Sequence, residues 1–215
     1  MRYIFILSLV FIISACGGKG NKNEETKALN PTDTLDKLLS IKNEAELIER
    51  FGAENVVWDT VFLAEGFKSM STLLYKGTCD QVEIIWKNSK TKEGVKNVTL
   101  KAMYDETEEK YIAFSHWKTS YNIMLGTTLK ELQDLNGTPF IFLGFGWDYG
   151  GFITEFNGGK LSKLPIELHM EYVNNENGIT NSDYDMLMGD NEYNSDDAEA
   201  QRLNPVVVSI SIINK

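Results

Sequence analysis

The sequence is poor in positive charge. Its 215 residues include 21 Lys and Arg but 31 Asp and Glu, so the formal net charge is -10. The isoelectric point is about 4.8. A nucleic-acid partner requires clustered Lys and Arg to neutralise phosphates, so we expect no nucleic-acid partner. Anionic substrates are disfavoured for the same reason.

Histidine is also scarce, because the chain has only His116 and His169. Neither lies in an H-x-x-H or H-E-x-x-H spacing, so the sequence does not predict a histidine-rich metal site. A catalytic triad could be assembled on paper from Ser115, His116 and Asp148. Nothing in their spacing favours it, and the G-x-S-x-G motif is absent. His169 alternates with apolar neighbours and is expected to be a half-exposed strand residue. Because no catalytic motif is found, we predict a protein that is not an enzyme.

Only two cysteines, Cys16 and Cys79, are present. This number excludes a disulfide-dense scaffold, so stability must come mainly from packing. Long apolar runs are missing as well, except between Ile4 and Ile13. That run follows Arg2, is too short to span a bilayer as a permanent helix, and is followed by small residues. This three-part layout predicts a secretory signal peptide over residues 1–15.

The end of this signal carries a family resemblance. Residues Ile13-Ser14-Ala15-Cys16 resemble the lipobox of bacterial lipoproteins, with Ile where Leu is commoner. In that family the signal is cleaved before the Cys, which is acylated on its sulfur and on its new amino group. The resemblance implies that Cys16 carries acyl chains such as palmitate, which hold the protein on a membrane at about 0.8 kcal/mol per buried methylene. An ordinary cleaved signal, or an uncleaved anchor, is the alternative.

Residues 16–34 contain few apolar side chains and are rich in Gly, Asn, Lys and Glu. Such a composition cannot bury enough surface to fold, so we predict a flexible tether. No Asp follows Cys16 directly, and by resemblance to enterobacterial sorting this permits delivery to the outer membrane. The predicted location is the cell envelope, at the outer membrane or facing the periplasm, and the leaflet stays open.

Two short helices are predicted from their end signals. Asn43 is an N-cap with Glu three residues later, and Gly52 ends the apolar stripe that follows. Thr128 is a second N-cap with Glu three residues later, and Gly137 ends that helix. The two segments match cap for cap, which suggests copies of one unit over residues 35–122 and 123–215.

Short stretches rich in β-branched and aromatic residues follow each predicted helix and often alternate in polarity. We predict an α+β fold in which antiparallel meanders carry short helices on one face, as one unit or as two tandem units. The expected strands lie in the sequences VVWDTVFL, STLLYK, QVEIIW, VKNVTLKAMY, FIFLGFGW, FITEF, IELHMEYV and VVVSISII.

A second resemblance rests on the later helix. Gly126-Thr127-Thr128, Leu132 and Gly137-Thr138-Pro139 are similar to the signature of the SmpA/OmlA/BamE lipoproteins and of β-lactamase-inhibitor-like domains. The likeness covers roughly residues 123–172, and the earlier unit departs from it at Ile41 and Glu54. It implies a protein-interaction module that places helices on a meander. No binding residue of those families maps onto this chain.

The stretch FLGFGWDYGGF, residues 142–152, places glycines among aromatic side chains. It is not a dinucleotide fingerprint, because a second strand rather than a helix follows it. Residues 148–151 predict a tight turn, and glycines inside a strand favour a bulge or a close approach. One interpretation is a twisted hairpin with its aromatic side chains in the core. The other is an exposed platform in which Trp147 and Tyr149 meet a sugar ring or a partner, with Asp148 as hydrogen-bond acceptor.

Residues 181–201 form an acidic segment with no basic residue. Such a density of carboxylates can attract calcium outside the cytosol, although the spacing does not fit an EF-hand loop. The alternative is a solvated acidic loop or short helix. Met186 and Met188 are expected to anchor this segment to the core. The candidate calcium ligands are Asp183, Asp185, Asp190 and Glu192.

Together these patterns predict a lipid-anchored envelope protein that binds a protein partner. Carbohydrate or peptidoglycan binding through Trp147 and Tyr149 is the first alternative, and a calcium-dependent form of either is the second. No cofactor other than this calcium ion is expected.

Overall fold

The computed structural model describes residues 33–62, 68–108, 110–173 and 184–214. The predicted signal peptide and almost all of the predicted tether, with Cys16, lie outside these ranges. The described chain combines short helices with antiparallel sheets, so the α+β prediction is confirmed. Within the same ranges, no helix has both the length and the apolar character needed to cross a bilayer.

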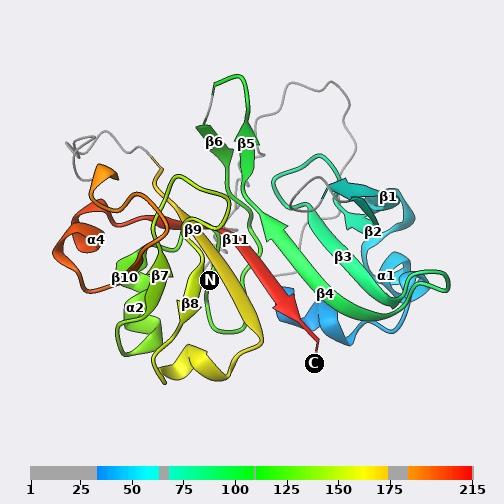
Figure 1. Cartoon of the computed structure of the whole chain (residues 1–215). Helices are drawn as coiled ribbons and strands as arrows, with labels where there is room; N and C mark the ends of the chain where they lie inside the picture. The colour runs from blue at the N-terminus through cyan, green and yellow to red at the C-terminus, as the bar shows by residue number, and fades with distance from the viewer. Residues whose placement is uncertain (1–32, 63–67, 109, 174–183, 215) are drawn as a thin grey trace, which may run out of the picture.

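A six-stranded antiparallel sheet organises the molecule (Figure 1). Its order is β1-β2-β3-β4-β11-β9, so the last strand of the chain lies between β4 and β9. Strands from both of the expected units therefore share one sheet, and residue 122 does not separate two sheets. The strands are β1 (Val56–Phe62), β2 (Lys68–Leu74), β3 (Val82–Asn88), β4 (Glu93–Lys101), β9 (Ile166–Glu171) and β11 (Val206–Ile213).

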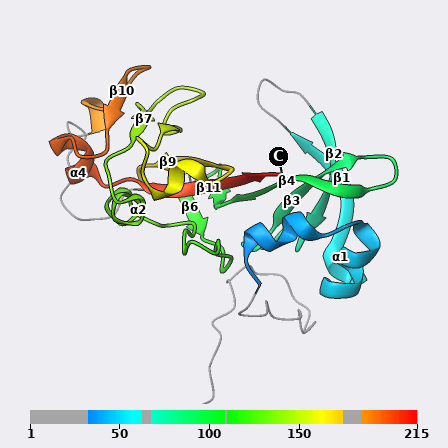
Figure 2. The same cartoon turned by 90° about the horizontal axis from the view of Figure 1, so that it is seen from below.

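Alternation of side chains sorts the two faces of this sheet. In β3, the buried residues Val82, Ile84 and Trp86 alternate with less buried ones, because successive side chains of a strand point to opposite faces. The 3-10 helix η1 (Leu35–Ser40) and helix α1 (Glu44–Phe51) cover the apolar face (Figure 2). On the other face, cross-strand hydroxyls meet, as where the Thr99 and Ser211 oxygens lie 2.9 Å apart.

Both predicted helices begin and end where their signals indicate. The Asn43 side chain accepts a hydrogen bond from the Glu46 backbone N–H at the start of α1, and Gly52 is its C-cap. Helix α2 (Leu129–Asn136) begins with a full capping box between Thr128 and Glu131. It ends at Gly137, whose left-handed φ of 80° suits glycine. Leu47 and Leu132 are fully buried, so each helix packs through its apolar stripe.

A smaller three-stranded sheet lies beside the large one, in the order β10-β7-β8. Its strands are β7 (Ile141–Leu143), β8 (Ile153–Glu155) and β10 (Glu192–Asn194). The hairpin of β5 (Met103–Asp105) and β6 (Lys110–Ala113) projects from the upper edge of the molecule in Figure 1. Further helical segments in the described residues include η2 (Ala53–Asn55), η4 (Lys160–Lys163) and α4 (Ala198–Leu203).

Candidate functional site

The stretch between β7 and β8 exposes two aromatic side chains. Trp147 is 39% exposed and Tyr149 is 49% exposed. Their ring centroids are 5.4 Å apart, and the rings meet edge to face at 65°. Phe142 and Phe145 of the same stretch are fully buried. The two interpretations of this stretch therefore apply to different residues, because the phenylalanines lie in the core while Trp147 and Tyr149 face solvent.

A network of backbone hydrogen bonds holds the exposed pair in place. The Gly150 N–H donates to the Trp147 carbonyl at 2.9 Å, which closes a turn over residues 147–150, one residue earlier than the predicted turn. The indole N–H of Trp147 donates to the Gly144 carbonyl, also at 2.9 Å. Gly151 then joins the turn to both sheets, since its N–H donates to the Leu143 carbonyl and its carbonyl accepts from the Met170 N–H. The loop is thus fixed at several points before any ligand arrives.

Glycine is required in this loop because other backbone approaches it closely. A Cβ atom on Gly144 would lie 2.6 Å from the carbonyl oxygens of both Leu187 and Gly189. On Gly151, where φ is +73°, it would lie 1.9 Å from the carbonyl oxygen of Met170. Both distances are far inside van der Waals contact. The expectation that a glycine inside this strand marks a close approach is confirmed at Gly144, where the approaching segment is the acidic one.

The acidic segment buries Leu187 against the loop and leaves both of its methionines exposed. Leu187 is 1% exposed, while Met186 is 56% exposed and Met188 is 39% exposed. The expectation that both methionines anchor the segment is wrong. The Phe145 N–H donates to the Leu187 carbonyl at 2.7 Å, and the Gly189 N–H donates to the Phe145 carbonyl at 2.9 Å. Met186 and Leu187 lie in a turn, in which the Leu187 N–H donates to the Tyr184 carbonyl at 3.0 Å, and only Leu187 of the three apolar residues is buried there.

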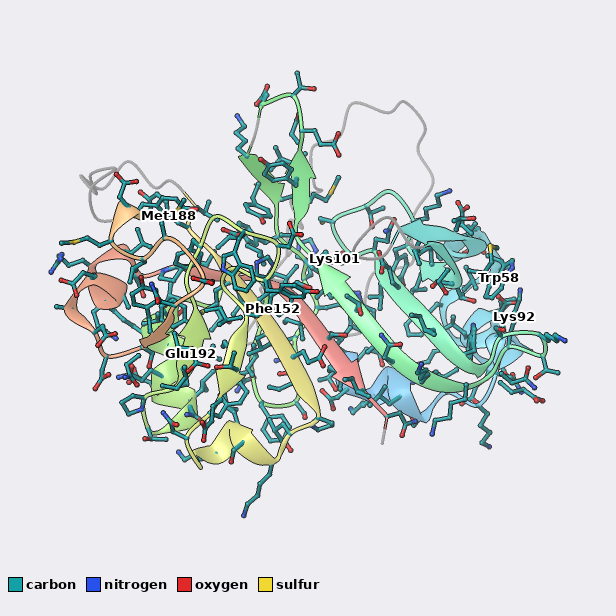
Figure 3. All side chains as sticks on the ribbon, in the orientation of Figure 1. Trp58, Lys92, Lys101, Phe152, Met188 and Glu192 are labelled. Carbon is teal, nitrogen blue, oxygen red and sulfur yellow. The ribbon has the colours of Figure 1, made fainter. Side chains whose placement is uncertain are left out.

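Four exposed apolar side chains lie on these two packed segments and are here called together the aromatic-methionine surface: Trp147, Tyr149, Met186 and Met188. Its members are four of the ten large hydrophobic side chains exposed in the described part of the chain. The segments also touch at Gly146, where a Cβ atom would lie 2.3 Å from the Met188 methyl carbon. Met188 is labelled in Figure 3, at the end of the molecule away from β1 and β2.

The segment is held from below by aromatic packing. The Tyr193 hydroxyl donates to the carbonyls of Met186 and Met188, at 3.1 and 3.4 Å. The Tyr184 ring stacks on Phe145 with 5.7 Å between centroids. Burial, reinforced by the nearby Glu171 carboxylate, raises the pKa of the Tyr184 hydroxyl above its usual value of 10.0. Tyr184 therefore stays neutral at physiological pH, so it adds no charge beneath the surface.

Negative charge dominates around the aromatic-methionine surface. Residues 140–159 and 184–201 contain no Lys, Arg or His. Asp148 lies between the two aromatic residues and is exposed, as are Asp185 and Asp190 on either side of the methionines. The carboxylates of these two ranges are Asp148, Glu155, Asp185, Asp190, Glu192, Asp196, Asp197 and Glu199.

The candidate calcium ligands are not gathered into one cluster where the structure describes them. Asp183 lies outside the described residues. Asp185, Asp190 and Glu192 are all exposed, and they form no group of three close oxygen ligands among the described side chains. Glu192 instead pairs across the small sheet with Leu143 and accepts a hydrogen bond from the Thr154 hydroxyl at 3.4 Å. Calcium binding by this segment stays a prediction.

Ser115 and His116, two members of the triad assembled on paper, both contact the Asp80 carboxylate instead of Asp148. The Ser115 hydroxyl donates to one oxygen of Asp80 at 2.7 Å, and the His116 Nδ1 atom lies 3.0 Å from the other. A nucleophilic serine requires its hydroxyl on the imidazole, so this arrangement is not a triad. The Cys79 sulfur lies within 4.8 Å of ligand atoms of Asp80 and His116, but the Cys79 side chain is buried. This group ties the turn after β2 to residues 115–117.

His169 lies on β9 as a partly buried strand residue, as its alternation predicts. Its ring stacks on Phe152 with centroids 4.7 Å apart, and its Nε2 atom is 3.2 Å from a Glu171 oxygen. Phe152 is labelled near the middle of Figure 3, where the small sheet meets β9. The contact explains His169 as a residue that joins the two sheets.

An open depression of about 630 Å³ lies beside the start of α2. Two of its polar side chains are engaged: the Thr127 hydroxyl accepts from the Met124 N–H, and a Glu131 oxygen closes the capping box. Its lining residues include Phe114, Asn122, Leu125 and Leu135.

Comparison of the chain with protein-family models, with curated proteins and with solved structures gives no match. The candidate site is therefore assigned from its own geometry, and the two family resemblances stay predictions.

Proposed function

We propose that this chain is a lipid-anchored bacterial cell-envelope protein without enzymatic activity, which acts as a protein-interaction module. The observation that carries the proposal is the exposure of Trp147 and Tyr149 on a loop fixed by backbone hydrogen bonds. Rigid aromatic anchors are typical of protein interfaces, because they contribute large contact area and lose little conformational freedom on binding.

The membrane anchor is proposed from the sequence alone. The lipobox-like residues before Cys16 and the polar stretch of residues 16–34 support a protein whose folded part is joined to a membrane by a tether. Metabolic labelling with a clickable palmitate tests the anchor. Label on the wild-type protein and none on Cys16→Ser is the expected result, and an unlabelled wild-type protein contradicts it.

The interaction is tested by photocrosslinking in cells. A photoreactive amino acid that replaces Tyr149 is expected to give one discrete adduct with an envelope protein. The same amino acid at Met70 is the control, because Met70 is 42% exposed on β2 at the opposite end of the molecule (Figures 1 and 2). Equal adducts from both positions, or none from either, would remove the aromatic-methionine surface as a contact site.

Carbohydrate binding is a second candidate function, since sugar sites commonly combine exposed aromatic rings with a hydrogen-bond acceptor, and Asp148 lies between Trp147 and Tyr149. Two observations favour a protein instead. The rings of Trp147 and Tyr149 meet edge to face, which leaves no broad coplanar platform for a sugar ring. The Trp147 N–H is already used by the Gly144 carbonyl. A peptidoglycan pulldown that succeeds with wild type and fails with Trp147→Ala would favour the carbohydrate function.

A further inference from the structure

We infer that the aromatic-methionine surface binds a basic amphipathic segment of a protein partner, with apolar side chains at its centre and Lys or Arg at its rim. This inference deepens the proposed function and rests on it. It names the chemistry of the partner from the composition and the charge of the surface.

The centre of the surface selects apolar side chains. Trp147, Tyr149, Met186 and Met188 are each between 39% and 56% exposed, so a partner can remove substantial apolar area from water. Methionine is unbranched and polarizable, and it adapts to apolar side chains of different shapes. The aromatic pair is rigid while the methionines adapt, which suits an amphipathic segment that inserts several apolar residues.

The rim selects positive charge. Asp148, Asp185 and Asp190 are exposed beside the apolar residues, and the two ranges that build the surface carry eight carboxylates without a single base. A partner segment with acidic residues would be repelled by these carboxylates, whereas Lys and Arg would be attracted. Because the rim is exposed, this attraction acts within about 8 Å at physiological salt and weakens at higher ionic strength.

The scaffold beneath the surface reduces the cost of binding. Phe145 exchanges two backbone hydrogen bonds with the acidic segment, and Tyr193 holds the carbonyls of both methionine residues. The backbone of both segments is thus ordered before the partner arrives, so the partner pays little to order this side of the interface. The affinity for a partner then depends mainly on the apolar and charged side chains of the partner segment.

Two synthetic peptides test the inference against the purified full-length protein in detergent. Both carry the same leucine and phenylalanine face, and their polar face carries Lys and Arg in one and Glu in the other. Fluorescence anisotropy of each labelled peptide measures its affinity. We expect the basic peptide to bind at least about tenfold more tightly than the acidic one, with an advantage that shrinks as salt is raised.

Matched variants locate the binding. Trp147→Ala and Met188→Ser are expected to weaken the basic peptide at least about tenfold, as at interface hot spots. Met70→Ser is the control for exposed methionine. Asp148→Asn combined with Asp190→Asn should weaken binding at low salt only, with Glu49→Gln on α1 as the charge control. Trp147→Ala also removes the indole hydrogen bond to the Gly144 carbonyl. If this loss disturbs the loop, Tyr149→Ala is the variant used to test binding instead.

Failure of this inference is distinct from failure of the proposed function. Equal affinities for the two peptides, no binding of the basic peptide, or wild-type binding by both Trp147→Ala and Tyr149→Ala would overturn it. A crosslinked partner at Tyr149 together with any of these results would leave the interaction function standing and would remove only the basic segment. Absence of both peptide binding and crosslinking would remove both.

Discussion

Two glycines with the same backbone conformation provide a sharp test of how the candidate site is built. Gly151 has φ of +73° and Gly158 has φ of +70°, so both lie in the left-handed region that an alanine adopts at a cost of about 1 kcal/mol. They differ in their surroundings. A Cβ atom on Gly151 would lie 1.9 Å from the Met170 carbonyl oxygen, whereas nothing lies within 4 Å of one on Gly158.

The magnitudes follow from this difference. Gly158→Ala should lower the free energy of unfolding by about 1 kcal/mol, the conformational cost alone. Gly151→Ala adds overpacking, at about 1–3 kcal/mol, and strains the two hydrogen bonds that Gly151 makes with Leu143 and Met170, at about 1 kcal/mol each. We expect a total of about 4–6 kcal/mol for Gly151→Ala.

Urea unfolding followed by circular dichroism measures both variants. The midpoint should shift little for Gly158→Ala and strongly for Gly151→Ala, with similar slopes if the unfolded states are alike. In thermal melts the same difference corresponds to roughly 3 °C per kcal/mol for a chain of this size. Equal destabilisation of the two variants would refute the conclusion that the loop carrying Trp147 and Tyr149 is fixed by close backbone contact with β9.

Three further predictions concern stability. Thr128→Ala removes the capping box of α2 and should cost about 1 kcal/mol, whereas a change within 0.3 kcal/mol in urea unfolding would show that the cap contributes little. Leu187→Ala should cost about 2–5 kcal/mol because the side chain is 1% exposed, while Met186→Ala should stay within about 0.5 kcal/mol; the reverse order would restore the methionines as anchors. Burial, and after it the nearby Glu171 carboxylate, raises the pKa of the Tyr111 hydroxyl well above 10.0. The neutral hydroxyl therefore contributes stability that is complete below the pKa of Tyr111 in the unfolded chain and is lost as the pH rises toward its pKa in the folded protein. Between about pH 9 and pH 11 the free energy of unfolding should therefore fall less for Tyr111→Phe than for the wild type. An equal fall in both proteins would contradict the raised pKa of Tyr111.

Part of the candidate site was predictable from the sequence. Trp147, Asp148 and Tyr149 stand out because glycines and a turn signal surround them, and a turn brings its side chains toward solvent. Their exposure could not be separated from burial in advance, since Phe142 and Phe145 in the same stretch are in the core. Periodicity gives the alternation of a strand but does not say which of its faces is covered.

The methionines show where local pattern fails. Met186, Leu187 and Met188 are all apolar, so composition alone suggests that any of them anchors the acidic segment. Which one does so depends on the register between this segment and Phe145, and that register is set by hydrogen bonds between residues about 40 positions apart. The sign of the charge around the surface, by contrast, is plain from the chain, because no base occurs in either segment.

The sequence by itself determined the limits of both main helices and the position of most strands, because caps at Asn43 and Thr128 and alternating side chains act within a few residues. Only the tertiary structure decided that β11 inserts between β4 and β9, and that Ser115 and His116 meet Asp80. These arrangements join segments 35 or more residues apart, and their free energy depends on all the contacts made at once. The aromatic-methionine surface arises at that level, where two loops distant in sequence pack side by side, bury Phe145 and Leu187 between them, and leave the four surface side chains exposed.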